Sequence, residues 1–198
     1  MTIHAATTGD LPQVSELLAE SFQNDPVSTW LFPDARRRRE VQPAFLGVFA
    51  ALALESGGMV SWRTDGLAAT VWLPSGDDED TPDRFGMLAD DETARFGHLA
   101  TLMAENSPDR GDHMHLQLIA VHPTSQRLGA GGELLTHDLA ILDDSGTHAY
   151  LEASSWLSPP LYKRHGFEFT GKPFGPEPRT RMYPMWRDAR QPDTPPFR

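Results

Sequence analysis

A segment in the second half of the chain has the composition of an anion-binding loop. It reads Val121-His122-Pro123-Thr124-Ser125-Gln126-Arg127-Leu128-Gly129-Ala130-Gly131-Gly132 and joins an apolar, β-branched run to a glycine cluster that opens a helix. Glycines let a backbone approach an anion closely, and the unpaired N–H groups at a helix start favour negative charge. The segment therefore predicts a site for a ligand with a diphosphate, and Arg127 is the nearest cation. The alternative is an ordinary strand-to-helix turn that needs positive φ angles.

Three phosphate-binding motifs can be compared with this segment. A Walker loop needs Lys-Ser or Lys-Thr after its last glycine, whereas Glu133-Leu134 follows here, so nucleotide hydrolysis is not expected. A dinucleotide fingerprint needs its third glycine where Leu134 stands. The pattern that fits is Gln/Arg-x-x-Gly-x-Gly/Ala, over residues 126–131, preceded by an apolar strand that ends at Val121.

With this pattern the chain resembles the GNAT superfamily of acyl-CoA-dependent N-acetyltransferases. A second segment supports the resemblance, since residues 150–155 (Tyr-Leu-Glu-Ala-Ser-Ser) and 160–167 (Pro-Leu-Tyr-Lys-Arg-His-Gly-Phe) are similar to the family's strand, short helix and Tyr-x-x-x-Gly-Phe ending. The likeness covers about His113 to Phe169 in its motifs. The helical first part is loosely similar to the branch that includes puromycin N-acetyltransferase.

The spacing of apolar residues predicts a mixed α/β order of elements. Helices are expected over Leu11–Phe22 and Val41–Leu52, the second one starting close to Pro43 or kinking there. Next we expect a hairpin of Met59–Arg63 with Leu67–Leu73, and then helical turns from Arg84 to Glu105. A β-α-β unit follows, in which the strands His113–Val121 and Thr147–Ala153 enclose the glycine turn and a helix. A short helix over Leu157–Arg164, a strand after Gly166 and a last strand over Arg179–Trp186 end the pattern. The resemblance implies a GNAT fold: a central mixed, mostly antiparallel sheet with a splayed parallel β-α-β core and flanking helices.

Length and composition limit the classes of protein that the chain can belong to. With 198 residues and 39% hydrophobic content, one domain over residues 1–190 is expected, with 191–198 as a flexible tail and the acidic tract Asp77–Asp83 as a surface loop. The absence of cysteine excludes disulfides, thiolate-bound zinc and an acyl-cysteine intermediate. The pair His113-x-His115 has no third ligand nearby, so no metal is expected.

The charge of the chain bears on its partners. A net charge of -11 argues against nucleic acid and suits a cationic substrate, although acidity can also serve solubility alone. No stretch has the length and apolarity of a signal peptide or a membrane span, so we expect a cytoplasmic protein without a membrane partner. The sequence leaves a homodimer open.

The resemblance implies acetyl-CoA as co-substrate. In the family the pantetheine arm pairs with the splayed strand edge, which is here Leu118, Ile119, Ala120 and Val121. Backbone amides of the loop would hold the diphosphate, and Gln126 would shape the turn. The remaining residues expected at the cofactor are Arg127, Leu128, Gly129, Ala130, Gly131, Gly132 and Ser155.

Two residues are expected to carry the chemistry. Tyr162 would meet the departing sulfur, with a core tyrosine as the alternative. Glu152 points away from apolar neighbours on its strand and is the leading base for the amine, although a paired structural carboxylate is an equal reading. His115 is the second candidate for the base, and it is also expected near the substrate.

The acceptor wall is expected from the first helices. Phe22, Asp25 and Trp30 would offer a cationic amine a carboxylate and aromatic faces, whereas the alternative makes the two rings core and Asp25 the start of a turn before Pro26. The arginines at 36–39 are expected on a solvated helix face, with the cofactor's 3′-phosphate as the lesser alternative. We expect acetyl transfer to a primary amine of a small molecule by direct attack. An acyl-CoA sensor without turnover and a protein or peptide acetyltransferase are the alternatives.

Overall fold

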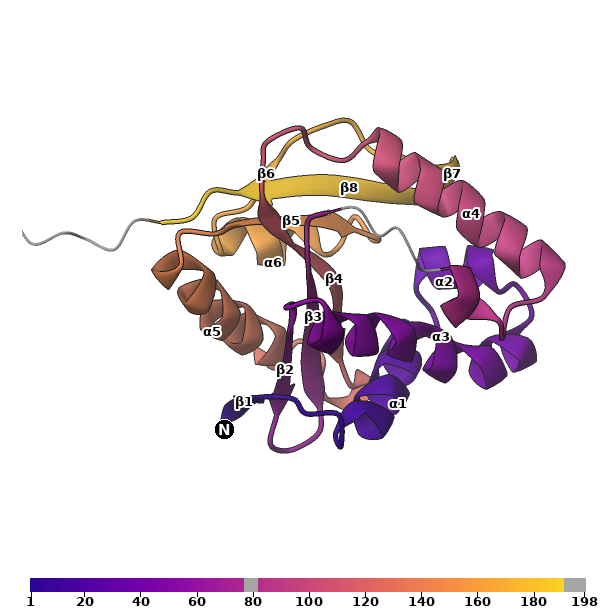
Figure 1. Ribbon diagram of the computed structural model, residues 1–198, viewed down its shortest axis with the longest axis horizontal. Helices are drawn as coiled ribbons and strands as arrows, with labels where there is room; N and C mark the ends of the chain where they lie inside the picture. Colours follow the sequence, from indigo (N-terminus) through magenta and orange to yellow (C-terminus); the bar gives the residue numbers. More distant parts are fainter. Residues whose placement is uncertain (77–81, 191–198) are drawn as a thin grey trace, which may run out of the picture.

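The computed structural model describes residues 1–76 and 82–190 (Figure 1). The tail at 191–198 and most of the acidic tract, residues 77–81, lie outside the described residues. The helices are α1 (Leu11–Phe22), α2 (Pro26–Leu31), α3 (Ala35–Glu55), α4 (Asp90–Glu105), α5 (Ala130–Asp144) and α6 (Pro159–Arg164), with single 3-10 turns at η1 (Pro82–Phe85) and η2 (Pro123–Ser125). In the described part of the chain, no helix has the length and apolarity needed to span a membrane.

One eight-stranded sheet organises the chain. Its order is β1-β2-β3-β4-β5-β8-β6, and β7 pairs with β8 beside this path. Among the described strands only β4 and β5 run parallel, and the other pairs are antiparallel, which confirms the predicted fold class. The strands are β1 (Ile3–Ala5), β2 (Met59–Arg63), β3 (Ala68–Pro74), β4 (His113–Val121), β5 (His148–Ala153), β6 (Glu168–Phe169), β7 (Phe174–Glu177) and β8 (Thr180–Arg187).

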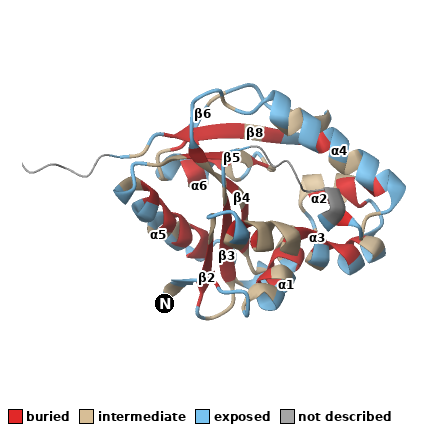
Figure 2. Cartoon of the chain, viewed as in Figure 1, coloured by how far each residue is buried: buried red, intermediate tan, exposed pale blue. Residues whose placement is uncertain are grey.

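Helices cover the two faces of the sheet unequally. In Figure 1, α1 to α4 lie on one side of the central strands, and α5 and α6 lie on the other. Two apolar clusters reflect this division: one joins α1 and α3 to the sheet, and the other joins α5 and α6 to it. Figure 2 shows the central strands mostly buried and the outer sides of α4 and α5 exposed. Apolar residues whose spacing predicted these helices are therefore among the residues that make up the two clusters.

A β-bulge in β4 changes which face its side chains occupy. Val71 pairs with Leu118 but Trp72 pairs with Leu116, so Gln117 is the extra residue. Leu116 accordingly packs with α5, whereas Leu118 packs with α1 and α3. Because side chains alternate along a strand, His115 lies on the same face as Leu118, the face covered by the first helices.

The helix predicted over Val41–Leu52 is longer than expected. It begins at Ala35, where the side chain of Asp34 accepts a hydrogen bond from Arg37 N (2.7 Å), and it contains Pro43 in its interior. Pro43 cannot donate to the carbonyl of Arg39, but that residue is exposed, so water can take the place of the missing donor. Of the two alternatives expected at Pro43, a helix start close to it was therefore wrong, and a kink there stays a prediction. The short elements β1, α2 and β7 were not predicted.

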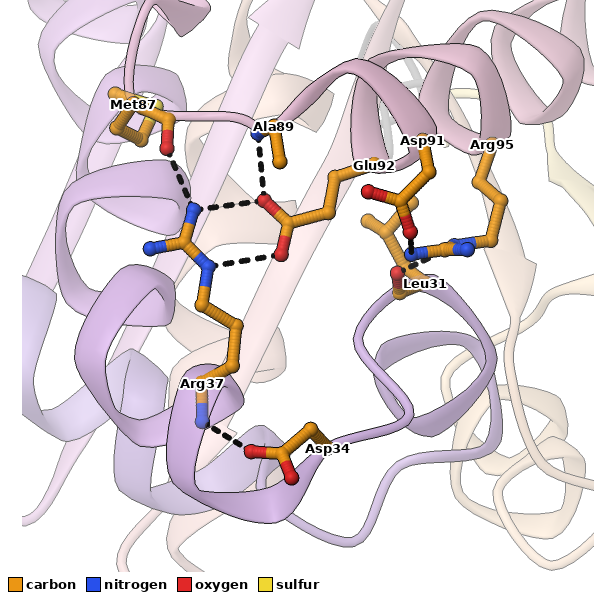
Figure 3. Close-up of polar contacts among 8 residues, drawn as sticks. All are labelled: Leu31, Asp34, Arg37, Met87, Ala89, Asp91, Glu92 and Arg95. Carbon is orange, nitrogen blue, oxygen red and sulfur yellow. Dashed lines mark hydrogen bonds and ion pairs between the residues drawn. The ribbon is translucent and has the colours of Figure 1, made fainter.

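The arginine run at 36–39 is not simply a solvated face, and this prediction was wrong for two of its members. Arg38 is buried and donates to the carbonyl groups of Gln23 (2.9 Å) and Phe32 (2.5 Å), at the C-terminal ends of α1 and α2. Arg37 makes two hydrogen bonds to Glu92 of α4 (2.8 and 2.9 Å) and one to Met87 O (2.7 Å), as Figure 3 shows. Arg38 therefore joins the ends of α1 and α2 to the start of α3, and Arg37 joins α4 to it.

Candidate functional site

The parallel strands β4 and β5 separate at the centre of the sheet. They pair only at His113 with His148, Met114 with Ala149, and His115 with Tyr150. Beyond these positions β4 continues to Val121 in register with β3, and β5 continues to Ala153 in register with β8. The facing edges of the two strands are therefore unpaired with each other over Leu116–Val121 and Leu151–Ala153. The expected edge, Leu118 to Val121, lies on this opening and has backbone groups free for a ligand.

The glycine loop follows directly after the β4 edge. Gln126 Nε2 donates to Val121 O (3.1 Å), which folds the loop back onto the strand end. Arg127 and Gly129 have φ angles of 64° and 97°, a left-handed conformation that only glycine adopts without strain. Glu133 N makes the first intrahelical bond, to Gly129 O (3.0 Å), so the amides of residues 130–132 have no intrahelical acceptor.

The packing of the protein itself does not require glycine at two of these positions. A Cβ atom added to Gly131 would lie 3.6 Å from Leu161 and from Val121, and one added to Gly132 would lie 3.6 Å from His165, which are ordinary contacts. Both residues lie inside α5, and glycine within a helix costs stability compared with alanine. The fold itself does not need these two glycines, and they lie beside amides without an intrahelical acceptor. Their presence is explained if an anion such as a diphosphate comes close to this backbone.

A histidine and a carboxylate meet where the two strands part. His115 Nε2 lies 2.6 Å from Glu152 Oε2. The predicted orientation of Glu152 is confirmed, because Ala149, Leu151 and Ala153 pack with α5 and Glu152 lies on the opposite face. The side chain of Glu152 is 4% exposed and that of His115 is 19% exposed, so His115 is the member of the pair that a ligand can reach.

Tyr162 enters the site from α6. Its ring is buried and packs edge-on against Phe167, with the ring centroids 6.0 Å apart. Burial raises the pKa of its phenol, and the charge of Asp25 adds to this effect. The ring is thus part of the core, as the alternative reading had it, while the hydroxyl stays protonated at neutral pH and can donate.

Asp25 is held between α2 and the loop after β5. Its Oδ1 accepts from Val27 N (2.9 Å) and Ser28 N (3.1 Å), and its Oδ2 accepts a short hydrogen bond from Ser154 Oγ. Burial raises the pKa of this carboxyl group despite these donors. Asp25 therefore begins a turn of helix before Pro26, as the alternative reading had it, and both of its oxygens already have partners. Its contact with a substrate remains a prediction.

The other expected site residues are placed as follows. Phe22 and Trp30 are half-buried and pack against the cluster of α1 and α3, and Trp30 also faces His98 at 6.3 Å between ring centroids. Ser155 Oγ accepts from Leu157 N (3.2 Å) in the loop between β5 and α6. Among the residues that the structure describes, no group of three His, Asp or Glu side chains could hold a metal ion.

Sequence reasoning missed an aromatic cluster beside the His115–Glu152 pair. Tyr150 and Trp186 are cross-strand partners, and His113 lies against both, with centroids 5.6 Å and 5.1 Å away. Burial lowers the pKa of His113, and its Nδ1 lies 2.8 Å from Gly111 O. The alternation His148, Tyr150, Glu152 on β5 was the signal that could have found the cluster.

One comparison with known proteins identifies a family, and another finds proteins of similar fold. A family model described as acetyltransferase (GNAT) domain matches residues 78–186. Similar solved structures include one described as histone acetyltransferase HPA2 and related acetyltransferase from Corynebacterium glutamicum (23% identity, TM-score 0.66, covering 97% of this chain and 98% of that one). Another is arylalkylamine N-acetyltransferase 2 from Aedes aegypti (13%, TM-score 0.69, 96% and 99%), and a third is an agmatine N-acetyltransferase (16%, TM-score 0.64, 93% and 97%). A search of curated proteins found no match. At these identities the solved structures show the fold alone.

Proposed function

Because the chain belongs to the GNAT acetyltransferase family, we propose that it transfers an acetyl group from acetyl-CoA to a primary amine of a small molecule by direct attack. The observation that carries the proposal is the His115–Glu152 pair, at the position where β4 and β5 separate. Acyl transfer to an amine needs a base that the amine can reach, next to the site that holds the acyl donor. His115 lies beside the unpaired strand edge, where both conditions can be met.

The co-substrate would be held by backbone groups. Amides of residues 127–132 would face the diphosphate, and the edge of β4 over residues 118–121 would pair with the pantetheine arm. When bound, acetyl-CoA supplies a thioester, whose carbonyl carbon is open to attack by a neutral amine. The Gly131 and Gly132 positions support this placement, since they leave room that the fold does not use.

The pair of His115 and Glu152 would take the proton of the amine. An alkylamine with a pKa near 10.4 costs about 4.5 kcal/mol to neutralise at pH 7, so a base is needed. Glu152 is too deeply buried to be the first acceptor, whereas His115 is partly exposed. We assign proton removal to His115. Glu152 fixes the ring through Nε2 and stabilises the imidazolium that forms.

Tyr162 would assist the departing thiolate. Its phenol stays protonated because burial and the Asp25 carboxylate oppose its ionisation. A thiol has a pKa near 8.5, well below that of this phenol, so complete proton transfer is unfavourable and hydrogen-bond donation to the sulfur is the expected role. The network of Asp25 with Ser154 would hold the first helices against this centre.

The proposal is tested by measuring release of free thiol from acetyl-CoA over a panel of amines. The panel contains an arylalkylamine, agmatine and a lysine-containing peptide, and acetyl-CoA binding is measured in parallel by calorimetry. We expect thiol release with at least one small amine. Binding without turnover of any acceptor would identify a sensor, and turnover of the peptide alone would identify a peptide acetyltransferase, so either result overturns the proposal.

A further inference from the structure

Tyr150 carries a buried hydroxyl group that makes no hydrogen bond of ordinary geometry among the described residues. The residue is 2% exposed and its hydroxyl oxygen is inaccessible to water. A buried, unpaired hydroxyl costs free energy that phenylalanine, with the same ring, would not. Without a hydrogen bond of ordinary geometry the hydroxyl adds little to the stability of the fold, so its presence needs another explanation.

The position of the Tyr150 hydroxyl suggests why it is there. Tyr150 is the register partner of His115, and their ring centroids are 5.4 Å apart. Tyr150 and Glu152 occupy alternate positions of β5, so their side chains lie on one face. Tyr150, His115 and Glu152 thus form one cluster, in which Glu152 Oε2 already faces His115 Nε2 at 2.6 Å.

The hydroxyl can act on this cluster as a dipole. A phenolic hydrogen rotates about the C–O bond, and without a partner of its own it turns toward the nearby carboxylate charge. Burial raises the pKa of Tyr150, and both the charge of Glu152 and hydrogen bonding of the phenol to its carboxylate add to this effect, so the phenol stays a donor over the working pH range.

We propose that Tyr150 is a positioning residue whose hydroxyl supports the Glu152 carboxylate and thereby sets the proton affinity of His115. The inference rests on the proposed function, in which His115 accepts the proton of the amine. A carboxylate beside an imidazole favours the imidazolium, and a hydroxyl directed at the carboxylate weakens that effect. Without the hydroxyl, His115 would hold its proton more tightly and would be unavailable as a base at lower pH.

Other ionisable groups surround the cluster and stay constant in the test. They are His113 against the Tyr150 ring, Asp112 near His113, and Arg110 and His148 against Trp186. A change from Tyr150 to phenylalanine leaves all of them in place. The difference between the two proteins therefore reports the hydroxyl alone.

The experiment compares wild type with Tyr150→Phe by two readouts. The first is the titration of the His115 imidazole by NMR, assigned by the signal that His115→Gln lacks. The second is the pH profile of kcat with the best amine of the panel. We expect the His115 midpoint and the acid limb of the profile both to move up by about half a pH unit, with KM changed less than twofold. Superimposable titrations, or a downward shift, would overturn the inference.

Two further variants sharpen the result. Tyr183→Phe makes the same chemical change on the opposite face of the sheet and is expected to shift neither readout. In a Glu152→Gln background, Tyr150→Phe is expected to lose its effect on His115, because the carboxylate through which it acts is gone. The NMR titration needs no turnover. An enzyme inactive with every amine would therefore refute the proposed function, while the titration would still decide whether Tyr150 acts on His115.

Discussion

His115 of β4 and Glu152 of β5 meet through a 2.6 Å contact between Nε2 and Oε2, beside the last residue pair that joins the two parallel strands. Beyond this contact the two strands no longer pair. His115, which is partly exposed while Glu152 is almost fully buried, therefore lies at the opening between the strands. Acid–base chemistry and the proposed cofactor edge are thus positioned by one feature, the divergence of β4 from β5.

Substitution of His115 tests the assignment of the base. We expect His115→Gln to lower kcat/KM by about 10²- to 10⁴-fold for an alkylamine, because the amine must then lose its proton to water. An acceptor with an amine pKa near 7.7 needs little help and should lose far less. Steady-state rates with two amines of different pKa measure this. Equal losses for both amines would contradict a role in proton removal.

Removal of the Tyr162 hydroxyl tests its role in thiolate departure. We expect Tyr162→Phe to lower kcat by about tenfold or more while the dissociation constant of acetyl-CoA changes less than twofold, since the ring and its contact with Phe167 remain. Single-turnover rates and calorimetry measure the two quantities. An unchanged kcat would remove Tyr162 from the mechanism.

Alanine at Gly131 tests whether the glycine loop serves a ligand. The added Cβ makes ordinary contacts with Leu161 and Val121, so the fold should be kept, and the melting temperature should stay the same or rise. Acetyl-CoA affinity should fall about tenfold or more if an anion approaches this backbone closely. Gly129→Ala is the comparison: its φ of 97° predicts lower stability. Unaltered acetyl-CoA affinity in Gly131→Ala would contradict the expected cradle.

Much of this architecture could be predicted from local pattern. The spacing of apolar residues gave the helices α1 and α5 and the β-α-β unit, and alternation along β5 gave the direction of Glu152. The bulge at Gln117 could not be predicted, because one extra residue changes the face of His115 without any signature in residue type. Arg38 was misread for a related reason. Its partners are backbone carbonyl groups from two helix ends, which have no sequence pattern.

Asp138 of α5 is expected to be the most sensitive buried carboxylate of the core. It is inaccessible to water, and its oxygens lie within hydrogen-bond distance of Ser61 Oγ (2.5 Å), Thr70 Oγ1 (2.5 Å), Trp72 Nε1 (2.9 Å) and His137 Nδ1 (2.9 Å). Asp138→Asn places an amide donor against these donors and should lower the free energy of unfolding by about 3 kcal/mol. Urea denaturation measures this, with the exposed Asp144→Asn as the control. A loss no larger than that of the control would contradict the network.

The Arg37–Glu92 contact gives a pH-dependent prediction. Glu92 is almost fully buried in this pair, and the hydrogen bonds of Arg37 hold the pKa of its carboxyl group below the ordinary value. A lowered carboxyl pKa contributes stability that is complete above the unfolded-state pKa and is lost as the pH falls through the folded-state pKa. Glu92→Gln should therefore be about 2 kcal/mol less stable than wild type near pH 7, and the gap should close in acid, below the ordinary glutamate pKa of 4.5.

A matched control separates this contact from surface charge in general. Arg36 and Glu40 form an exposed pair at 3.2 Å on the same helix, so Glu40→Gln should change stability by less than about 0.5 kcal/mol at any pH. Urea denaturation at several pH values measures both variants. Because Arg37 ties α4 to the start of α3 (Figure 3), we also expect faster amide hydrogen exchange in α4 of Glu92→Gln near pH 7. A stability gap that is constant with pH would mean that the charge on Glu92 is not what joins the two helices.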